Sequence, residues 1–217
     1  MTKEEQFEWL KHILKENNIK YWADFGTLLG LIRDKKLIKN DGDIDLGLWE
    51  DQIDLLEQIK QNIIEKGYVL KKSIYKGYIY QYSFKSINKD LRHIDFHIFR
   101  KKGDIAWSLQ KGVKKNKSFL FKIYNKILGR LMSDNENINV DKVPYKWNFD
   151  LVTWIIDKEY FEELIYLDNF EIYIPKEYDK YLTLHYGNWR VPAKGWNYLE
   201  DDGALKQGKP ELYLENI

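Results

Sequence analysis

The chain has 217 residues, enough to bury one core, and its 35 Lys and Arg nearly balance its 34 Asp and Glu. This balance provides no global positive field, so we expect no nucleic-acid partner, and an anionic substrate has to be held by local groups. There is no cysteine, which excludes disulfides, zinc ribbons and thiol nucleophiles.

The first part of the chain predicts a helix, a strand and a second helix. Apolar residues recur at helical spacing through residues 4–17, which is typical of an amphipathic helix. The aromatic segment 19–25 predicts a strand, Gly26 a turn, and residues 28–32 a short helix packed against the sheet. The N-terminus is charged, and no stretch approaches the roughly 18 apolar residues of a spanning helix. We therefore expect a cytoplasmic protein with at most peripheral contact at the inner face of the membrane.

The middle of the chain is rich in predicted strands. Residues 43–48 alternate strictly between polar and apolar, which predicts a half-buried strand. Residues 50–66 predict a helix that ends at Gly67. Four short strands separated by turns are predicted next, at residues 68–74, 78–86, 93–100 and 104–109.

The last part of the chain mixes helices with a single strand. Helices are predicted at residues 118–131, 158–167 and 178–186. We expect a polar loop at 133–141 and a strand at 170–174 that ends at Pro175. The order of elements predicts an α+β fold, a mixed sheet flanked by helices with C-terminal helical additions. We assign residues 1–110 to the core and 111–217 to an extension that packs on the core and completes the substrate cleft.

The sharpest motif is a pair of acids on one strand. Residues two apart on a strand project to the same face, so the carboxylates of Asp43 and Asp45 stand side by side. The two groups repel unless a cation binds between them, and Mg²⁺, with Mn²⁺ as the alternative, prefers such oxygen ligands. Asp95 lies in a later apolar strand and is predicted to complete the site. Such sites stabilise the attacking and leaving oxygens of a displacement at phosphorus.

The Gly–Thr pair upstream of these acids suits a phosphate. A strand that enters a helix through Gly26 and Thr27 exposes backbone N–H groups at the positive end of the helix. Arg33 is a permanently charged donor six residues further on and is expected to contact the same phosphates.

The histidines and one basic stretch each allow several interpretations. His93, Asp95 and His97 share a strand face, which fits a transition-metal site, a histidine bonded to the acid or phosphate, or ordinary sheet-surface histidines. We interpret His185 as a packing residue at a helix end rather than a catalytic base. The basic stretch 111–122 is either the solvated start of a helix or a surface for an anionic glycan or lipid-linked acceptor.

Three segments together resemble a known family. Residues 26–48, GTLLGLIRDKKLIKNDGDIDLGL, combine G-T-L-L-G-x-x-R with an acidic run, and residues 93–99, HIDFHIF, carry the later acid. Residues 174–192, IPKEYDKYLTLHYGNWRVP, place a Tyr–Gly pair between two prolines. These segments resemble the LicD family, which is similar to fukutin-type proteins. The resemblance implies a nucleotidyltransferase-type fold.

The resemblance also implies an activity, namely metal-dependent transfer of a substituted phosphate. The group is phosphocholine or a polyol phosphate, the donor is CDP-linked, and the acceptor is a hydroxyl of a cell-surface or lipid-linked glycan. Asp95 is implied as the third metal ligand or as the base. The expected site comprises Asp43, Asp45 and Asp95 as metal ligands and catalytic residues, Gly26, Thr27 and Arg33 as donor-phosphate contacts, and His97, Tyr186 and Trp189 as candidate substrate contacts.

The chain departs from the family pattern at three places. Gly42 stands where the family has an acid, Lys39–Asn40 where Pro–Trp is common, and His97 where Pro is frequent. These departures keep the Asp43 and Asp45 pair but leave the donor and acceptor open. The alternative enzyme is a nucleotidyltransferase that moves a nucleoside monophosphate from a triphosphate to a small molecule, RNA or protein. A non-catalytic glycan-binding protein, suggested by 8 Trp and 16 Tyr, is the third hypothesis.

Overall fold

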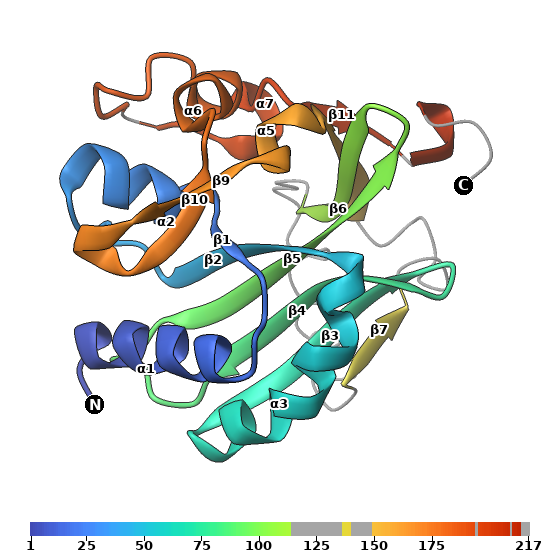
Figure 1. Cartoon of the computed structure of the whole chain (residues 1–217). Helices are drawn as coiled ribbons and strands as arrows, with labels where there is room; N and C mark the ends of the chain where they lie inside the picture. The colour runs from blue at the N-terminus through green and yellow to red at the C-terminus, as the bar shows by residue number, and fades with distance from the viewer. Residues whose placement is uncertain (114–135, 140–148, 194, 209, 214–217) are drawn as a thin grey trace, which may run out of the picture.

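The computed structural model describes residues 1–113, 136–139, 149–193, 195–208 and 210–213 (Figure 1). Among these residues, nine strands form one sheet, and two more form a separate hairpin. The sheet strands are β1 (Trp22–Ala23), β2 (Asp43–Trp49), β3 (Tyr68–Tyr75), β4 (Tyr78–Ser86), β5 (His93–Lys102), β6 (Ile105–Val113), β7 (Asn137–Asn139), β8 (Phe149–Asp157) and β11 (Leu205–Gln207). The hairpin strands are β9 (Leu164–Leu167) and β10 (Ile172–Pro175).

The helices surround this sheet. The α-helices are α1 (Lys3–Glu16), α2 (Phe25–Leu29), α3 (Ile53–Glu65), α5 (Glu159–Glu162), α6 (Tyr178–Tyr186) and α7 (Tyr198–Asp201). Helix α2 continues into the π-helical turn η1 (Gly30–Asp34), and short 3₁₀ turns occur at η2 (Glu50–Gln52), η4 (Asp168–Phe170) and η5 (Pro210–Leu212). The fold is therefore α+β, as predicted.

Strand β5 is the centre of the sheet. It runs parallel to β2, antiparallel to β4 and, at its C-terminal end, antiparallel to β6. The long path of the sheet is β11-β8-β6-β5-β4-β3-β7, with β2 and then β1 branching from β5. Only the β2–β5 and β3–β7 pairs are parallel among the described strands, so the sheet is mainly antiparallel.

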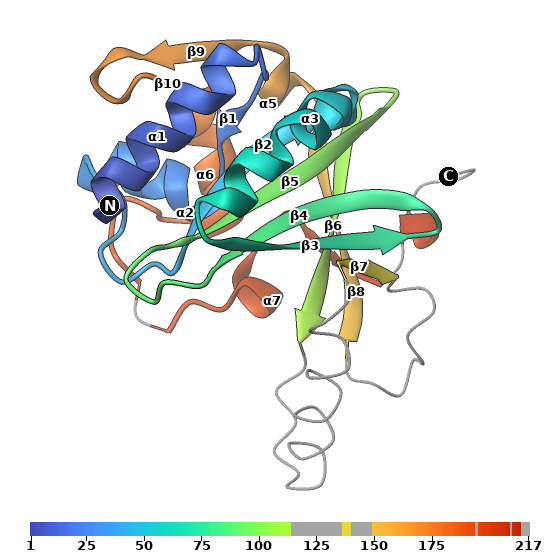
Figure 2. The ribbon, with the colours of Figure 1, turned by 90° about the horizontal axis from the view of Figure 1, so that it is seen from below.

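The two faces of the sheet have different roles. One face is apolar and lies under α1 and α3, which Figure 2 shows side by side in front of it. Ile44 and Ile94 are fully buried there, and the Tyr82 hydroxyl donates to the Glu57 carboxylate of α3 at 2.5 Å. On this face Gln6 of α1 also donates to the hydroxyl of Tyr68. The alternate residues of β2 and β5, including the acids, point to the opposite face, on the side of α2 and α6 (Figure 1).

Most predicted elements before residue 113 are confirmed. Helix α1 begins with a capping box at Thr2, and α3 ends before Gly67, whose positive φ of 93° suits glycine. Strands β2 to β6 follow the predicted order. The strand predicted at 19–25 shrinks to Trp22–Ala23, because α2 already begins at Phe25 with Asp24 as its cap. Gly26 thus lies inside the helix, and the prediction that it forms the turn is wrong.

The prediction for the last part of the chain was only partly correct. Helix α6 is confirmed, but the helix predicted at 158–167 ends at Glu162, and residues 164–167 pair with β10 instead. The paired strand buries Ile172 and Ile174 completely, a tertiary gain that local helix propensity cannot show. Within the described residues after 113, the additions are consequently not mainly helical, since β8 and β11 extend the sheet.

Three other predictions concern residues 110–141, which the structure describes only in part. The helix predicted at 118–131 lies outside the described residues, as does most of the loop predicted at 133–141. Within that loop, residues 137–139 form strand β7 on the edge of β3, so this part of the prediction is wrong. Strand β6 crosses residue 110, and the division of the chain at that position stays a prediction.

Candidate functional site

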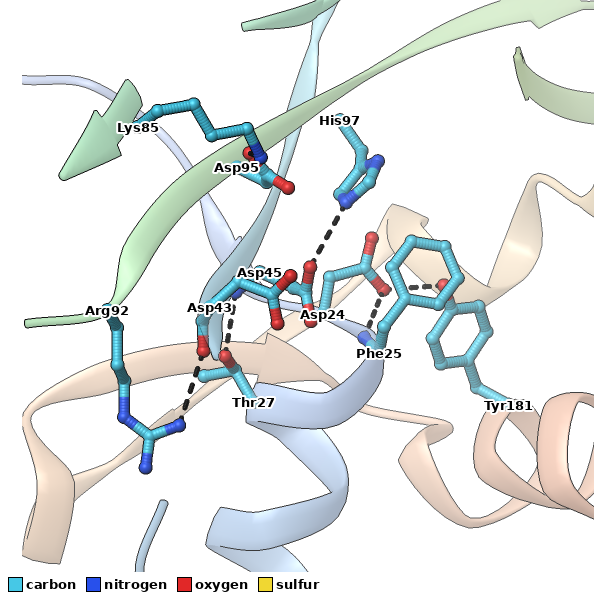
Figure 3. Close-up of polar contacts among 10 residues, drawn as sticks. All are labelled: Asp24, Phe25, Thr27, Asp43, Asp45, Lys85, Arg92, Asp95, His97 and Tyr181. Atoms are coloured by element: carbon cyan, nitrogen blue, oxygen red, sulfur yellow. Dashed lines mark hydrogen bonds and ion pairs between the residues drawn. The ribbon is translucent and has the colours of Figure 1, made fainter. Parts of the chain in front are cut away.

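The register of β2 and β5 brings the acids of two distant segments together. Asp45 lies opposite Asp95, and Asp43 lies opposite His93, in the parallel pair. Directly paired residues of neighbouring strands project to the same face, so Asp43, Asp45 and Asp95 share one face of the sheet, as Figure 3 shows. Asp95 also contacts the ammonium of Lys85 on β4, with Nζ 3.5 Å from Oδ1.

The tightest group of acids includes a residue that the sequence analysis missed. Ligand atoms of Asp41, Asp43 and Asp45 all lie within 4.8 Å of one another. Asp95 stands beside this trio rather than in it. The missed signal is the spacing in N-D-G-D-I-D, where acids recur at every second residue and Asp41 continues the alternation of the strand.

Burial and the neighbouring acidic charges raise the pKa values of Asp43 and Asp45. Burial, followed by the hydrogen bond and charge of Asp41, raises the pKa of Asp43 to about 7. Burial also raises the pKa of Asp45 to about 6, with the charges of Asp43 and Asp95 adding to it. Asp43 and Asp45 are thus costly to ionise, and a divalent cation with oxygen ligands removes that cost. The donor set fits Mg²⁺ or Mn²⁺.

Gly26 supports this arrangement by having no side chain. A Cβ atom at this position would overlap Oδ2 of Asp41 and would lie 3.3 Å from Oδ2 of Asp45. The first turn of α2 therefore borders the acids closely, and a side chain at position 26 would force the Asp41 carboxylate to move. Contact between Gly26 and a donor phosphate stays a prediction.

Thr27 and Asp24 anchor α2 to the acidic strand. The buried Thr27 hydroxyl accepts a hydrogen bond from the backbone N–H of Asp45 at 2.8 Å, so its position is fixed against β2. Asp24, also missed from sequence, caps α2 by accepting from the Phe25 N–H at 3.0 Å and from the Tyr181 hydroxyl of α6 at 2.6 Å. Burial raises the pKa of Asp24 to about 6. One buried acid thus connects β1, α2 and α6.

His97 contacts the Asp45 carboxylate and helps to orient it. Its Nε2 lies 3.3 Å from Oδ1 of Asp45, and its ring packs edge-on against Phe25 and Trp154. Burial lowers the pKa of His97, but the hydrogen bond and charge of Asp45 outweigh this and raise it overall. At 2% exposure the ring is buried, which favours an orienting role over direct substrate contact. The other histidine of the strand, His93, accepts from the Ser86 N–H through Nδ1 at 2.9 Å.

Arg92 holds the loop that carries the first acids. Its guanidinium is buried and donates to three backbone carbonyls, those of Ile38 at 2.6 Å, Asp41 at 2.7 Å and Asp43 at 3.4 Å. No local sequence pattern identifies Arg92, because its partners are backbone atoms of a segment some fifty residues earlier. The loop therefore approaches β2 in a fixed conformation.

The remaining predicted site residues are placed as follows. Arg33 makes a two-point ion pair with Asp34, at 2.7 and 2.9 Å, so its guanidinium already has a partner. Tyr186 ends α6 with its ring 4.7 Å from that of Trp196. Trp189 is buried, with the Arg190 guanidinium 4.4 Å from its ring. Contacts of these residues with substrate stay predictions.

His185 belongs to a buried network on α6. Its Nδ1 lies 2.8 Å from Oδ2 of Asp202, which also accepts from the Trp154 indole at 3.2 Å. The ring packs edge-on against Phe25 at 5.1 Å. This environment agrees with the packing role that we expected for His185.

Two rickettsial proteins resemble about a quarter of the chain. Uncharacterized protein RP689 of Rickettsia prowazekii is 40% identical over 58 residues, which are 27% of this chain and 22% of that protein. Uncharacterized protein RT0683 of Rickettsia typhi is 39% identical over 59 residues, 27% of this chain and 19% of that protein. The matched part thus spans about a fifth of the length of these relatives.

Across the described ranges, no helix has both the length and the apolar composition required for a membrane span.

A family profile covers the acidic cluster and the segments that hold it. Residues 18–125 match the profile described as LicD/FKTN/FKRP, nucleotidyltransferase domain, and this range contains the three clustered acids, Gly26, Arg92 and Asp95. The resemblance inferred from the motifs is therefore confirmed. The chain belongs to the LicD family through the domain at residues 18–125.

Proposed function

We propose that this chain transfers a substituted phosphate, such as phosphocholine or a polyol phosphate, from a CDP-linked donor to a hydroxyl of a cell-surface glycan. Membership of the LicD family suggests a transferase of the phosphotransfer type. The observation that supports the proposal most strongly is the trio Asp41, Asp43 and Asp45, with ligand atoms within 4.8 Å. The reaction takes place in the cytoplasm, where the acceptor is a glycan or a lipid-linked glycan at the inner face of the membrane.

The same trio would hold the metal ion. Carboxylate oxygens are hard ligands that suit Mg²⁺ and Mn²⁺. Burial and then the neighbouring acidic charges raise the pKa values of Asp43 and Asp45, and a cation relieves this cost of ionisation. When bound, such an ion neutralises phosphate oxygens and the leaving group. His97 and the Thr27 hydroxyl fix Asp45 from its side chain and its backbone. A ligand held rigidly in this way needs little reorganisation during the reaction.

In the proposed reaction Asp95 accepts the proton of the acceptor hydroxyl. It stands next to Asp45 on the same face, and Lys85 balances its charge. As the proton moves to Asp95, the acceptor oxygen forms a bond to the phosphorus that carries the alcohol group. The bond from that phosphorus to the bridging oxygen breaks, and CMP leaves with the electron pair. Positioning and charge neutralisation supply most of the catalysis in such transfers.

The test is donor-dependent release of CMP. Purified protein with Mg²⁺ is incubated with CDP-choline, CDP-glycerol or CDP-ribitol, with and without glycan acceptors, and CMP is quantified. Asp45→Asn should abolish release. Asp54→Asn should preserve it, because Asp54 is an exposed acid on α3, behind the opposite face of the sheet. Equal CMP release by wild type and Asp45→Asn would exclude the proposed site.

A nucleotidyltransferase reaction is the second candidate, favoured by the description of the matching family domain. In that reaction a nucleoside triphosphate donates its nucleoside monophosphate and pyrophosphate leaves. Pyrophosphate release from triphosphates without CMP release from CDP-alcohols would establish this alternative.

A further inference from the structure

A deep groove lies between α1 and the β9–β10 hairpin, at the edge of the sheet beyond β1. Its volume is about 1070 Å³, at the upper end of the range for pockets that hold drug-sized ligands. Both ribbon views place the hairpin beside α1, and residues 18–21, which connect α1 to β1, line the groove between them (Figures 1 and 2). None of the clustered acids lines this groove.

Three tyrosines give the groove an aromatic side. Tyr166 of β9 and Tyr173 of β10 form a cross-strand pair with ring centroids 5.0 Å apart, inclined by 61°. Both rings remain strongly exposed, at 40% and 46%, although they lie in a concave surface. Tyr21 lines the groove nearby, and burial together with the charges of the other two hydroxyls raises its pKa. Exposed rings with polar edges are suited to stacking against the apolar faces of sugars.

Lysines line the other side. Lys11 is nearly buried, donates to the Phe170 carbonyl at 2.6 Å and pairs with Glu8 at 2.8 Å, so it ties α1 to the hairpin turn. Lys15 and Lys20 are exposed in the groove, and neither makes an ion pair within the described part of the chain. Three lysines against two glutamates, the second being Glu171, leave a positive excess. This excess favours an anionic ligand over a cationic one.

From these observations we infer that the groove binds an acidic oligosaccharide, whose rings stack on Tyr166 and Tyr173 while its anionic groups pair with Lys15 and Lys20. The volume has room for more than one sugar ring. A membrane surface fits less well, because interfacial binding buries an apolar face in the membrane, and this site is concave and lined by charged residues on one side. The inference goes beyond phosphotransfer and does not depend on it.

The test is calorimetric titration in buffer with EDTA, so that the acidic cluster and its metal play no part. The probe is a tetrasaccharide of galacturonic acid, and maltotetraose is the neutral comparison. We expect the acidic chain to bind at least about tenfold more tightly, and its affinity to fall as salt increases.

The variants separate stacking from charge. Tyr166→Ala should weaken binding about tenfold, and Tyr166→Phe should preserve it. Lys15→Gln combined with Lys20→Gln should make the acidic and neutral chains bind equally. The matched controls are Tyr78→Ala, an exposed tyrosine on β4, and Lys89→Gln on the β4–β5 turn, both outside the groove, and neither should change the affinity.

Three results would overturn the inference. These are no measurable binding of the galacturonate chain, binding that survives both the tyrosine and the lysine substitutions, and capture by vesicles of anionic phospholipid without any binding of the tetrasaccharide. Melting curves of each variant confirm that the fold is intact. A negative result in these binding experiments leaves the phosphotransfer proposal unaffected, because that proposal is tested separately by CMP release.

Discussion

Replacing Asp45 by Asn should stabilise the metal-free protein and at the same time abolish its response to metal. Burial raises the pKa of Asp45 from 3.8 to about 6, and the side chain is only 13% exposed. Because the folded-state pKa is raised, the stability that the protonated acid provides is complete below about pH 4 and is lost as the pH rises through 6. A shift of about two units corresponds to roughly 3 kcal/mol. Asn resembles the neutral acid, so at pH 8 the variant should gain up to about 3 kcal/mol.

Addition of Mg²⁺, in contrast, should raise the stability of wild type and not that of the variant. At a free Mg²⁺ concentration of about 100 times Kd, binding to the native state alone stabilises wild type by about 2.7 kcal/mol. For a chain of this length about 2–4 °C of Tm correspond to 1 kcal/mol, so wild type should gain about 5–11 °C. Asp45→Asn removes a ligand from the trio and should show no such gain.

Thermal melts at pH 8 with EDTA and with Mg²⁺ measure both effects. Asp54→Asn, on the opposite side of the sheet, is the matched control and should keep the wild-type response to metal. The reasoning is refuted if Asp45→Asn melts below wild type in EDTA and still gains as much as wild type from Mg²⁺. That outcome would mean that Asp45 is stabilising as a carboxylate and takes no part in metal binding.

Further predictions concern the surroundings of the acids. Gly26→Ala should lower turnover about a hundredfold, because the added Cβ displaces the acids. Gly42→Ala is the control and should leave turnover unchanged, because no atom lies within 4 Å of its Cβ. Steady-state CMP release compares the two variants. Arg92→Met should lower the free energy of unfolding by about 2–4 kcal/mol, since three backbone carbonyls lose the donor that a buried guanidinium supplies, and urea denaturation measures this. Mg²⁺ affinity should fall as the pH decreases from about 8 to about 5, because protons compete for Asp43 and Asp45, whose pKa values are about 7 and about 6; calorimetry that found a constant affinity would contradict the assignment.

Local sequence patterns predicted the secondary structure correctly where they suit only one conformation. The alternation in residues 43–48 required a strand with the Asp43 and Asp45 side chains on one face, and the positive φ of Gly67 made it the end of α3. Patterns failed where a segment suits two structures. Residues 164–167 have helical neighbours, yet they pair with β10 because the hairpin buries Ile172 and Ile174. The period of a four-residue segment is too short to distinguish these outcomes.

The sequence by itself determined the family, the paired acids and the helices and strands around them, because each depends on residues close together in the chain. Only the tertiary structure decided that Asp95 stands beside Asp45, that Arg92 fixes the loop of Asp41, and that Tyr181 reaches Asp24. These contacts join segments that are 50 or more residues apart, and periodicity carries no information about which strands become neighbours. Residues close together in the chain therefore supply the candidate ligands, and the register of the strands brings them together with their more distant partners.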